Sequence, residues 1–212
     1  MIAIVDYRAG NITSVQRALQ YLGEPCEVTN DPAMLRAASR IIFPGVGAAG
    51  EAMANLRAGR LDTIIAEEVR AGKPVLGICL GTQVIFEYSE ENDNTACLGI
   101  VPGRVKRFPA DLRDNGRLLK IPHMGWNQVA FRRSHPVFQG LPEGAEFYFV
   151  HSYYPAPDDE QWGIGWTDYG IRFCAAIARK NLVAVQFHPE KSGAPGLKIL
   201  ANFCRWGGED AQ

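Results

Sequence analysis

The stretch PVLGICLGTQVIF, from Pro74 to Phe86, decides how this sequence is interpreted. It has the pattern of a short apolar strand, a Gly-x-Cys-x-Gly turn around Cys79, and an apolar helical run. Such a turn lifts a side chain above the sheet edge, toward the crevice where α/β proteins bind ligands. The flanking glycines leave room, and the positive end of the helix dipole favours a thiolate. We therefore interpret Cys79 as a candidate nucleophile; a buried, inert cysteine is the alternative.

Apolar runs and helical periodicities alternate through the first half of the chain. Continuous apolar runs, typical of parallel strands buried on both faces, occupy Ile2–Val5, Ile41–Phe43 and Pro74–Ile78. Apolar residues at helical spacing predict helices over Asn11–Leu22, Leu61–Ala71 and Gly81–Tyr88. This alternation predicts an α/β fold with an open, mostly parallel sheet and helices on both faces.

The second half of the chain has a different pattern, in which short strands dominate. We expect strands near Gly103–Arg107, Trp126–Phe131, Glu146–Val150, Cys174–Ala178 and Leu182–Phe187. Arg179–Asn181 has the composition of a hairpin turn, which predicts an additional antiparallel hairpin portion, and a final helix is expected over Gly196–Trp206. The 212 residues contain no repeat and no long linker, so we expect one domain over residues 1–212.

Composition narrows the class of protein. The formal net charge is −1, which predicts no attraction to nucleic acid or to anionic membranes. We find no signal peptide and no run of about 18 apolar residues, so no membrane association is expected. The five cysteines are widely spaced and form no C-x-x-C pair. Reduced thiols in a cytoplasmic protein, with no metal site and no cofactor, fit this pattern best.

A cysteine nucleophile requires a base and a group that orients the base. His188 and Glu190 follow an apolar strand in the sequence VQFHPE, and strand ends are where α/β active sites collect side chains. A carboxylate two residues on can hold one ring nitrogen and leave the other for the thiol. His135 lies in a polar turn and is expected to be solvated. His123 and His151, in more apolar surroundings, are expected to be core or site-lining residues.

Acyl chemistry also requires hydrogen-bond donors for a developing oxyanion. The backbone N–H of Leu80, directly after the nucleophile, is one candidate. The loop after the second strand, with Val46 and Gly47, is another, because its two glycines allow a close approach to a ligand. A tight turn without a role in chemistry is the alternative for this loop.

Taken together, the sequences GICLGTQ, FHPE and FPGVG resemble the class I, triad-type glutamine amidotransferases. The stretches KIPHMGWNQV, YFVHSYY and FHPEKSGAPGLKILANF narrow the resemblance to glutaminase subunits of imidazole glycerol phosphate synthases. The resemblance extends from Ile2 to about Trp206. It implies that Cys79 attacks the side-chain amide of glutamine, that His188 transfers the proton, and that Glu190 holds His188. It also implies glutamine-binding positions at Gln83, Glu91, Ser152 and Tyr153.

The same resemblance implies a partner. These subunits pair with a (β/α)₈-barrel cyclase that consumes the ammonia in histidine biosynthesis, so we expect a heterodimer. Interface positions implied by the resemblance are Asn11, Trp126 and Lys191, although Trp126 could equally be a core residue. Two departures from the family pattern are Thr82, where Met is usual, and Arg8, where Gly is commoner.

Two other functional interpretations remain open at this point. A glutaminase of the same kind could serve another acceptor, because relatives act in surface-sugar, anthranilate, nucleotide and cofactor synthesis. A binding-only subunit that keeps the fold without catalysis is the third interpretation. The presence of Cys79, His188 and Glu190 together argues against it.

Overall fold

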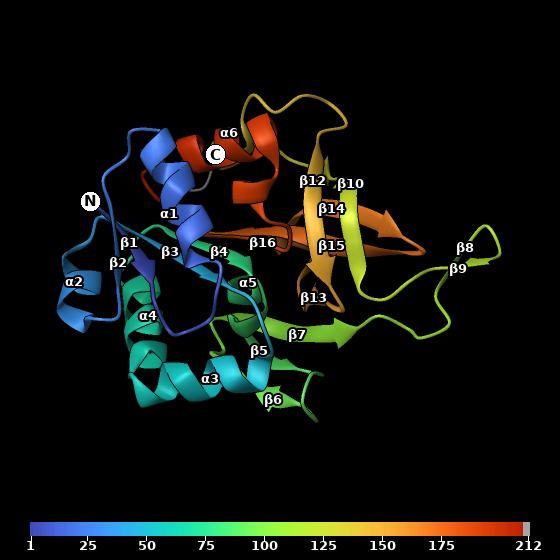
Figure 1. Ribbon diagram of the computed structural model, residues 1–212, viewed down its shortest axis with the longest axis horizontal. Helices are drawn as coiled ribbons and strands as arrows, with labels where there is room; N and C mark the ends of the chain where they lie inside the picture. Colours follow the sequence, from blue (N-terminus) through green and yellow to red (C-terminus); the bar gives the residue numbers. More distant parts are fainter. Residues whose placement is uncertain (210–212) are drawn as a thin grey trace.

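An eight-stranded sheet forms the centre of the protein, whose computed structural model describes residues 1–209 (Figure 1). The expected domain over 1–212 thus includes three residues outside the described range. The strand order is β11-β14-β15-β16-β4-β3-β1-β2. Its strands are β1 (Ile2–Val5), β2 (Cys26–Thr29), β3 (Arg40–Gly45), β4 (Val75–Cys79), β11 (Ala130–Phe131), β14 (Gly163–Tyr169), β15 (Ile171–Arg179) and β16 (Leu182–Val185).

Pairing in this sheet changes from parallel to antiparallel at β16. The strands from β16 through β4, β3 and β1 to β2 are parallel. The strands β11, β14, β15 and β16 pair antiparallel, and β15 and β16 form a hairpin. The predicted mostly parallel α/β sheet with an antiparallel hairpin portion is therefore confirmed.

Helices cover both faces of the sheet because its strands are apolar on both sides. Ile4 packs into one core and its neighbour Ala3 into the other, as strand alternation requires. One face carries α1 (Ile12–Tyr21) and α6 (Gly193–Arg205) (Figure 1). The other carries α2 (Pro32–Ala37), α3 (Ala49–Ala58) and α4 (Leu61–Arg70) (Figure 1).

Smaller sheets, built mainly from the second half of the chain, lie to one side of the main sheet (Figure 1). A four-stranded sheet has the order β13-β7-β5-β6, and two further pairs are β10-β12 and β8-β9. These strands are β5 (Phe86–Ser89), β6 (Thr95–Ala96), β7 (Val101–Arg107), β8 (Arg113–Asp114), β9 (Arg117–Leu118), β10 (His123–Gln128), β12 (Glu146–His151) and β13 (Tyr153–Pro157). Short 3₁₀ helices are η1 (Pro136–Phe138), η2 (Glu160–Trp162) and η3 (Pro189–Lys191).

The helix predicted over Gly81–Tyr88 is wrong in its second half. The helix α5 spans only Leu80–Val84, and Phe86–Ser89 forms the strand β5. This strand pairs with both β7 and β6 while Phe86 is fully buried, so sheet pairing prevails over the local helical pattern. Short apolar runs are ambiguous between helix and strand, which explains the error.

The expectation that His135 is solvated is also wrong. Its side chain is buried, and its ring lies 5.1 Å from that of Trp206 and 5.8 Å from that of Phe138. Nδ1 accepts a hydrogen bond from the Val137 backbone N–H at the start of η1. The C-terminal end of α6 covers this turn, which no local sequence signal indicates.

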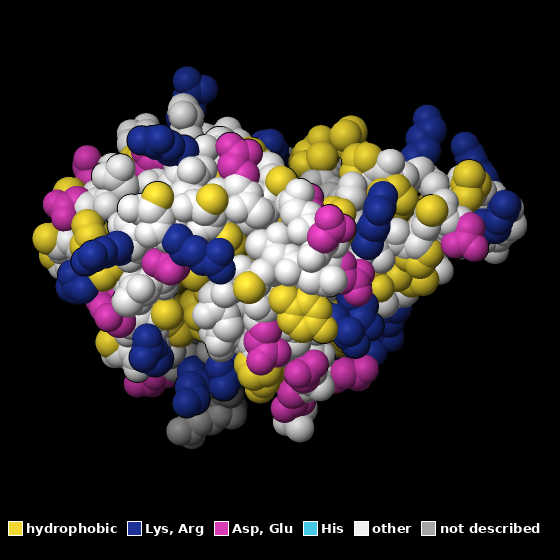
Figure 2. Space-filling model, turned by 90° about the horizontal axis from the view of Figure 1, so that it is seen from below, with side chains coloured by type: hydrophobic (Ala, Val, Ile, Leu, Met, Phe, Trp, Pro, Cys, Tyr) yellow, Lys and Arg dark blue, Asp and Glu magenta, His cyan; other side chains and the backbone are white. Residues whose placement is uncertain are grey.

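The surface matches the near-zero net charge. Lysine and arginine side chains alternate with aspartate and glutamate over the face shown in Figure 2, without a large area of one sign. Among residues 1–209, no helix combines the length and the apolar character needed to cross a membrane.

Candidate active site

Cys79 lies at the sharp turn between β4 and α5, at the carboxyl end of a central parallel strand. Its backbone has φ 53° and ψ −107°, a strained conformation for a residue with a side chain. Gly81 makes the turn possible, because a Cβ atom there would lie 1.8 Å from the Phe43 carbonyl oxygen. Cys79 as a whole residue is 6% exposed, so the turn presents the thiol to a nearly closed site.

His188 and Glu190 lie just beyond β16, the strand that pairs with β4. His188 Nδ1 is 2.8 Å from Glu190 Oε1, and both side chains are almost completely buried. The backbone N–H of His188 donates to the Tyr148 carbonyl, and the hydroxyl of Ser192 donates to the His188 carbonyl. These contacts fix the ring at the sheet edge where the Cys79 turn also ends.

The electrostatics of His188 favour a charged ring. Burial by itself lowers the pKa of His188, but the adjacent Cys79 and Glu190 outweigh burial and raise it to about 10. Nδ1 binds the carboxylate, while the buried Nε2 has no well-formed hydrogen bond within residues 1–209 and faces Cys79. The arrangement can therefore exchange a proton between sulfur and imidazole while the carboxylate stabilises the imidazolium.

Asn11, predicted at a partner interface, contacts this histidine–carboxylate pair. Its Nδ2 donates to Glu190 Oε1 and lies 3.4 Å from His188 Nδ1. The residue precedes α1 in a left-handed conformation with φ 72°. The N-terminus of α1 thus supports the carboxylate from a distant part of the chain, a role that sequence spacing did not indicate.

A hollow of about 260 Å³ opens beside Cys79. The predicted oxyanion residues Val46, Gly47 and Leu80 all line it. Gly47 has φ 110°, a conformation that glycine adopts freely, and Gly45 pairs with Cys79 at the end of β3. The structure therefore brings the glycine loop and the nucleophile turn to the same hollow.

The four predicted glutamine-binding residues also line this hollow: Gln83, Glu91, Ser152 and Tyr153. Gln83 lies one turn after the thiol on α5, and its Nε2 donates to the Tyr153 carbonyl at 3.1 Å. Glu91 accepts a hydrogen bond from the Ala49 backbone N–H at 2.7 Å, so its carboxylate is held at the N-terminus of α3. The hollow is thus lined by polar side chains as well as by the thiol.

Three further residues, which the sequence does not predict as site residues, surround the hollow or the Cys79 thiol. Pro122 and His151 line the hollow; the sequence predicted for His151 only a buried or site-lining position. Gln186, fully buried, places its side-chain Nε2 3.7 Å from Cys79 Sγ. A polar residue two positions before His188, in an otherwise apolar strand, was the signal that could have drawn attention to it.

The other two predicted interface residues lie on the surface and share a neighbour. Trp126 is 54% exposed, so it is not a core residue, and its ring lies 6.2 Å from that of Tyr148. Lys191 Nζ lies 5.9 Å from the centre of the same Tyr148 ring, and the His188 ring lies 6.5 Å from it. An exposed aromatic and cationic surface therefore begins directly beside the candidate catalytic histidine.

The two departures from the family pattern lie apart from each other. Thr82 is fully buried, and its hydroxyl donates to the Val185 carbonyl at 2.6 Å, which ties α5 to β16. Arg8 is exposed, with φ 64°, and its backbone N–H donates to the Asp6 carboxylate. Thr82 leaves the nucleophile turn intact, whereas Arg8 stands in the loop before α1 in a left-handed conformation that glycine adopts more easily.

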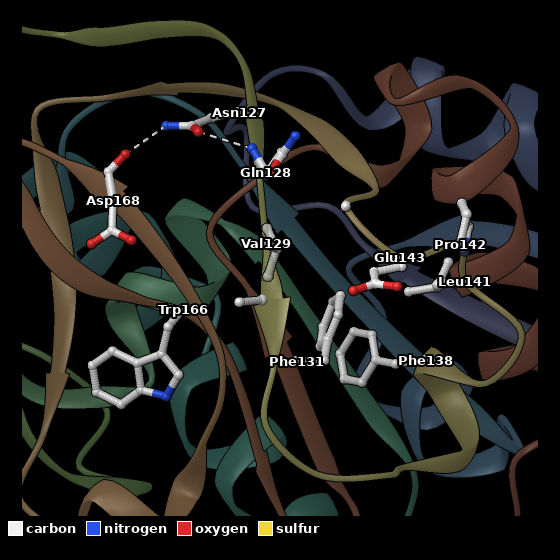
Figure 3. Close-up of a pocket in the computed structure, with 12 residues that line it drawn as sticks. Asn127, Gln128, Val129, Phe131, Phe138, Leu141, Pro142, Glu143, Trp166 and Asp168 are labelled. Carbon is white, nitrogen blue, oxygen red and sulfur yellow. Dashed lines mark hydrogen bonds between the residues drawn. The ribbon is translucent and has the colours of Figure 1, made fainter.

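A larger hollow of about 590 Å³ lies elsewhere, between β11, β14 and η1 (Figure 3). Its lining includes the aromatic residues Phe131, Phe138 and Trp166, and Asn127, whose amide donates to the Asp168 carbonyl (Figure 3). None of the lining residues is a cysteine or histidine. The smaller hollow beside Cys79 is therefore the better candidate for chemistry.

Comparison with known proteins places this geometry in a family. The sequence matches the family Glutamine amidotransferase class-I over residues 3–206. "Imidazole glycerol phosphate synthase subunit HisH" of Nitratidesulfovibrio vulgaris (strain DP4) is 53% identical, with 97% of this chain and 96% of that protein covered. The protein of the same name from Moorella thermoacetica (strain ATCC 39073 / JCM 9320) is 52% identical, with 95% and 93% covered.

Solved structures support the fold. A chain of PurLQS from Thermotoga maritima superposes with a TM-score of 0.72 at 16% identity, covering 96% of this chain and 97% of that one. The match to the family over residues 3–206 and the 53% identity to the first relative define the class: the chain belongs to the class-I glutamine amidotransferase family. Within that class it is an enzyme component of the HisH group, the relatives named as subunits of imidazole glycerol phosphate synthase.

Proposed function

We propose that this chain hydrolyses glutamine through a thioester on Cys79 and passes the ammonia to a (β/α)₈-barrel cyclase. The main support is that the Cys79 thiol lies beside the buried His188, whose Nδ1 binds Glu190. The names of the HisH relatives, at about half identity over nearly the whole chain, support the assignment to histidine biosynthesis.

In the first half-reaction, the Cys79 thiolate attacks the side-chain amide carbon of glutamine. The C–N bond breaks, the C–S bond forms, and the protonated His188 gives its proton to the leaving ammonia. Glu190 holds the ring orientation throughout. Water then attacks the γ-glutamyl thioester: the C–O bond forms, the C–S bond breaks and His188 takes a proton from the water, which releases glutamate and restores the Cys79 thiolate beside a protonated His188.

In this proposal, the hollow beside Cys79 holds the α-ammonium and α-carboxylate groups of glutamine. The side-chain amide hydrogens of Gln83 are donated to the Tyr153 carbonyl and to Gln186. Its side-chain oxygen can therefore accept a hydrogen bond from the α-ammonium group of glutamine. The Glu91 carboxylate also lines the hollow and provides the negative charge that an α-ammonium group requires. Backbone N–H groups near Ser152 and Tyr153 are the matching donors for the α-carboxylate, and those of Val46, Gly47 and Leu80 for the oxyanion.

Direct transfer of ammonia suits the position of the site. Ammonia released into water near pH 7 is mostly protonated and no longer a nucleophile, so the mouth has to be covered by the consuming enzyme. We propose that Trp126 and Lys191, next to His188, and the N-terminus of α1 at Asn11 lie on the face that the cyclase covers. Exposed aromatic side chains provide suitable anchors for such a face.

The experiment is glutamate release from glutamine, measured with and without the purified cyclase and its ribonucleotide substrate. Strong stimulation that is abolished by Cys79→Ser supports the proposal. Hydrolysis that does not respond to this cyclase would assign the ammonia to another acceptor. Unchanged hydrolysis by Cys79→Ser would refute the mechanism.

A further inference from the structure

The side chain of Gln186 connects two residues of the active site. It is fully buried directly after β16, where its backbone N–H donates to the Ala175 carbonyl. Its Oε1 lies 3.0 Å from Gln83 Nε2, and its Nε2 lies 3.7 Å from Cys79 Sγ. A buried amide is costly unless its polar atoms are bonded, so these contacts are expected to determine its orientation.

The direction of these hydrogen bonds follows from a backbone carbonyl. Gln83 Nε2 also lies 3.1 Å from the Tyr153 carbonyl oxygen, which can only accept. The Gln83 atom at this point must therefore be the amide nitrogen. Its second hydrogen then needs an acceptor, so Gln186 presents oxygen to Gln83 and an N–H group to the sulfur of Cys79.

The Tyr153 carbonyl is held by a second chain of donors. His151 Nδ1 donates to it at 2.7 Å, which leaves His151 Nε2 to accept from His123 Nδ1 at 3.0 Å. His123 Nε2 in turn accepts from Asn127 Nδ2 at 3.3 Å. Burial keeps both imidazoles neutral, because it lowers the pKa of His123 to about 4 and that of His151 to about 3. One tautomer of each ring satisfies every contact in the chain.

We infer that Gln186 is a positioning residue for the nucleophile, whose amide N–H holds the Cys79 thiolate in place and stabilises it. The inference rests on the proposed function of Cys79. His188 can exchange a proton with the sulfur, whereas an amide cannot titrate and therefore donates in every step. When the thiolate forms, Gln186 supplies a hydrogen bond that strengthens with the charge on sulfur.

The same hydrogen bond keeps the sulfur of Cys79 in one orientation. Cys79 occupies a strained backbone conformation, and its side chain needs a fixed direction toward the amide carbon of the substrate. Gln186 and His188 come from the same segment but contact the sulfur with different chemistry. Gln83, one turn after Cys79, links this support to the substrate hollow, so the orientation of Gln186 depends on the residue proposed to bind substrate.

The test is the pH profile of Cys79 alkylation by iodoacetamide, read by mass spectrometry of the Cys79 peptide in the free full-length chain. Gln186→Met keeps the volume but removes the donor. We expect alkylation at neutral pH to fall about tenfold and its midpoint to move up by about one pH unit. Gln186→Glu places a carboxylate beside the sulfur, and we expect a larger upward shift.

A matched control separates this effect from lost stability. Asn181 is also a buried amide, and its Nδ2 donates to the Val69 and Lys73 carbonyls away from the site. Asn181→Leu should lower the melting temperature and leave the Cys79 profile unchanged. Wild-type profiles in both folded Gln186 variants, with Cys79→Ser inactive, would overturn this inference alone. Glutaminase activity in Cys79→Ser would instead overturn the proposed function.

Discussion

The side-chain amide of Asn11 donates to Glu190 Oε1, the same oxygen that binds His188 Nδ1. The two residues are 179 positions apart, and the contact joins the N-terminus of α1 to the segment after β16. Glu190 Oε2, by contrast, is buried without a hydrogen bond among residues 1–209. Asn11 is therefore the second group that fixes the orientation of this carboxylate.

Asn11→Ala should weaken glutamine hydrolysis. Loss of a hydrogen bond to a buried charge costs about 1.5–3 kcal/mol, so we expect kcat/KM to fall at least about tenfold. The measurement is steady-state glutamate release by the free chain and by its complex with the cyclase. If Asn11 only contacts the partner, activity of the free chain will be unchanged and only the complex will be impaired.

The charge state of His188 gives a second prediction. Its pKa of about 10 depends on Cys79 and Glu190, so the ring should remain protonated through neutral pH in the wild-type chain. Glu190→Gln removes one of the two groups that raise this pKa, and NMR titration of the ring should show a lower value. A wild-type ring that titrates near 6.5, with no change in Glu190→Gln, would contradict this account of the site.

Gly81 provides a test of the nucleophile turn. A Cβ atom at this position would lie 1.8 Å from the Phe43 carbonyl oxygen, which can move only if β3 moves. Gly81→Ala should therefore lower the free energy of unfolding by about 3 kcal/mol, measured by urea denaturation. Gly207→Ala is the control, because a Cβ there meets nothing within 4 Å. Equal stability of the two variants would refute the close approach.

The buried pair His123 and His151 predicts a loss of stability in mild acid. Their folded pKa values, about 4 and about 3, lie below the ordinary value of 6.5. The unfolded chain therefore binds protons first as the pH falls below about 6.5, and the free energy of unfolding decreases. Each histidine contributes about 1.4 kcal/mol per pH unit until its folded pKa is reached.

The variant His123→Gln isolates this effect. Between pH 6.5 and pH 5 we expect wild type to lose about 2 kcal/mol more than the variant in urea denaturation. His188 has a raised pKa, so its stabilising contribution is fully present below about 6.5 and is lost only as the pH rises toward 10. It therefore does not change in this window. Identical pH slopes for wild type and variant would show that His123 is protonated in the folded chain.

The central fold could be predicted because its signals are local. Ile2–Val5 and Val75–Cys79 are continuous apolar segments, and apolar runs of this kind occur in parallel strands buried on both faces. Phe86–Ser89 could not be assigned in this way, because its strand character comes from pairing with β7 and β6. Pairing partners are distant in the sequence, and a short apolar run does not identify them.

The candidate site also contains some residues that local motifs predict and others that depend on contacts between distant parts of the chain. Cys79, His188 and Glu190 belong to short motifs whose spacing carries chemical meaning, and the structure brings them together. Gln186 and Asn11 lie 107 and 179 positions from the residues that they support. Their contacts arise only when β16 pairs with β4 and α1 packs beside η3. The only local signal for Gln186 is its polar side chain in an otherwise apolar predicted strand, and no local pattern distinguishes Asn11 from ordinary polar residues.

The most direct test of the mechanism is an acid quench of the active complex during turnover of radiolabelled glutamine. We predict that label remains covalently attached to the peptide containing Cys79 and is absent in Cys79→Ser. Cys97→Ser is the matched control and should retain the label, because burial raises the pKa of that half-buried thiol to about 11. Turnover without labelled Cys79 peptide, or label retained in Cys79→Ser, would contradict a thioester at this residue.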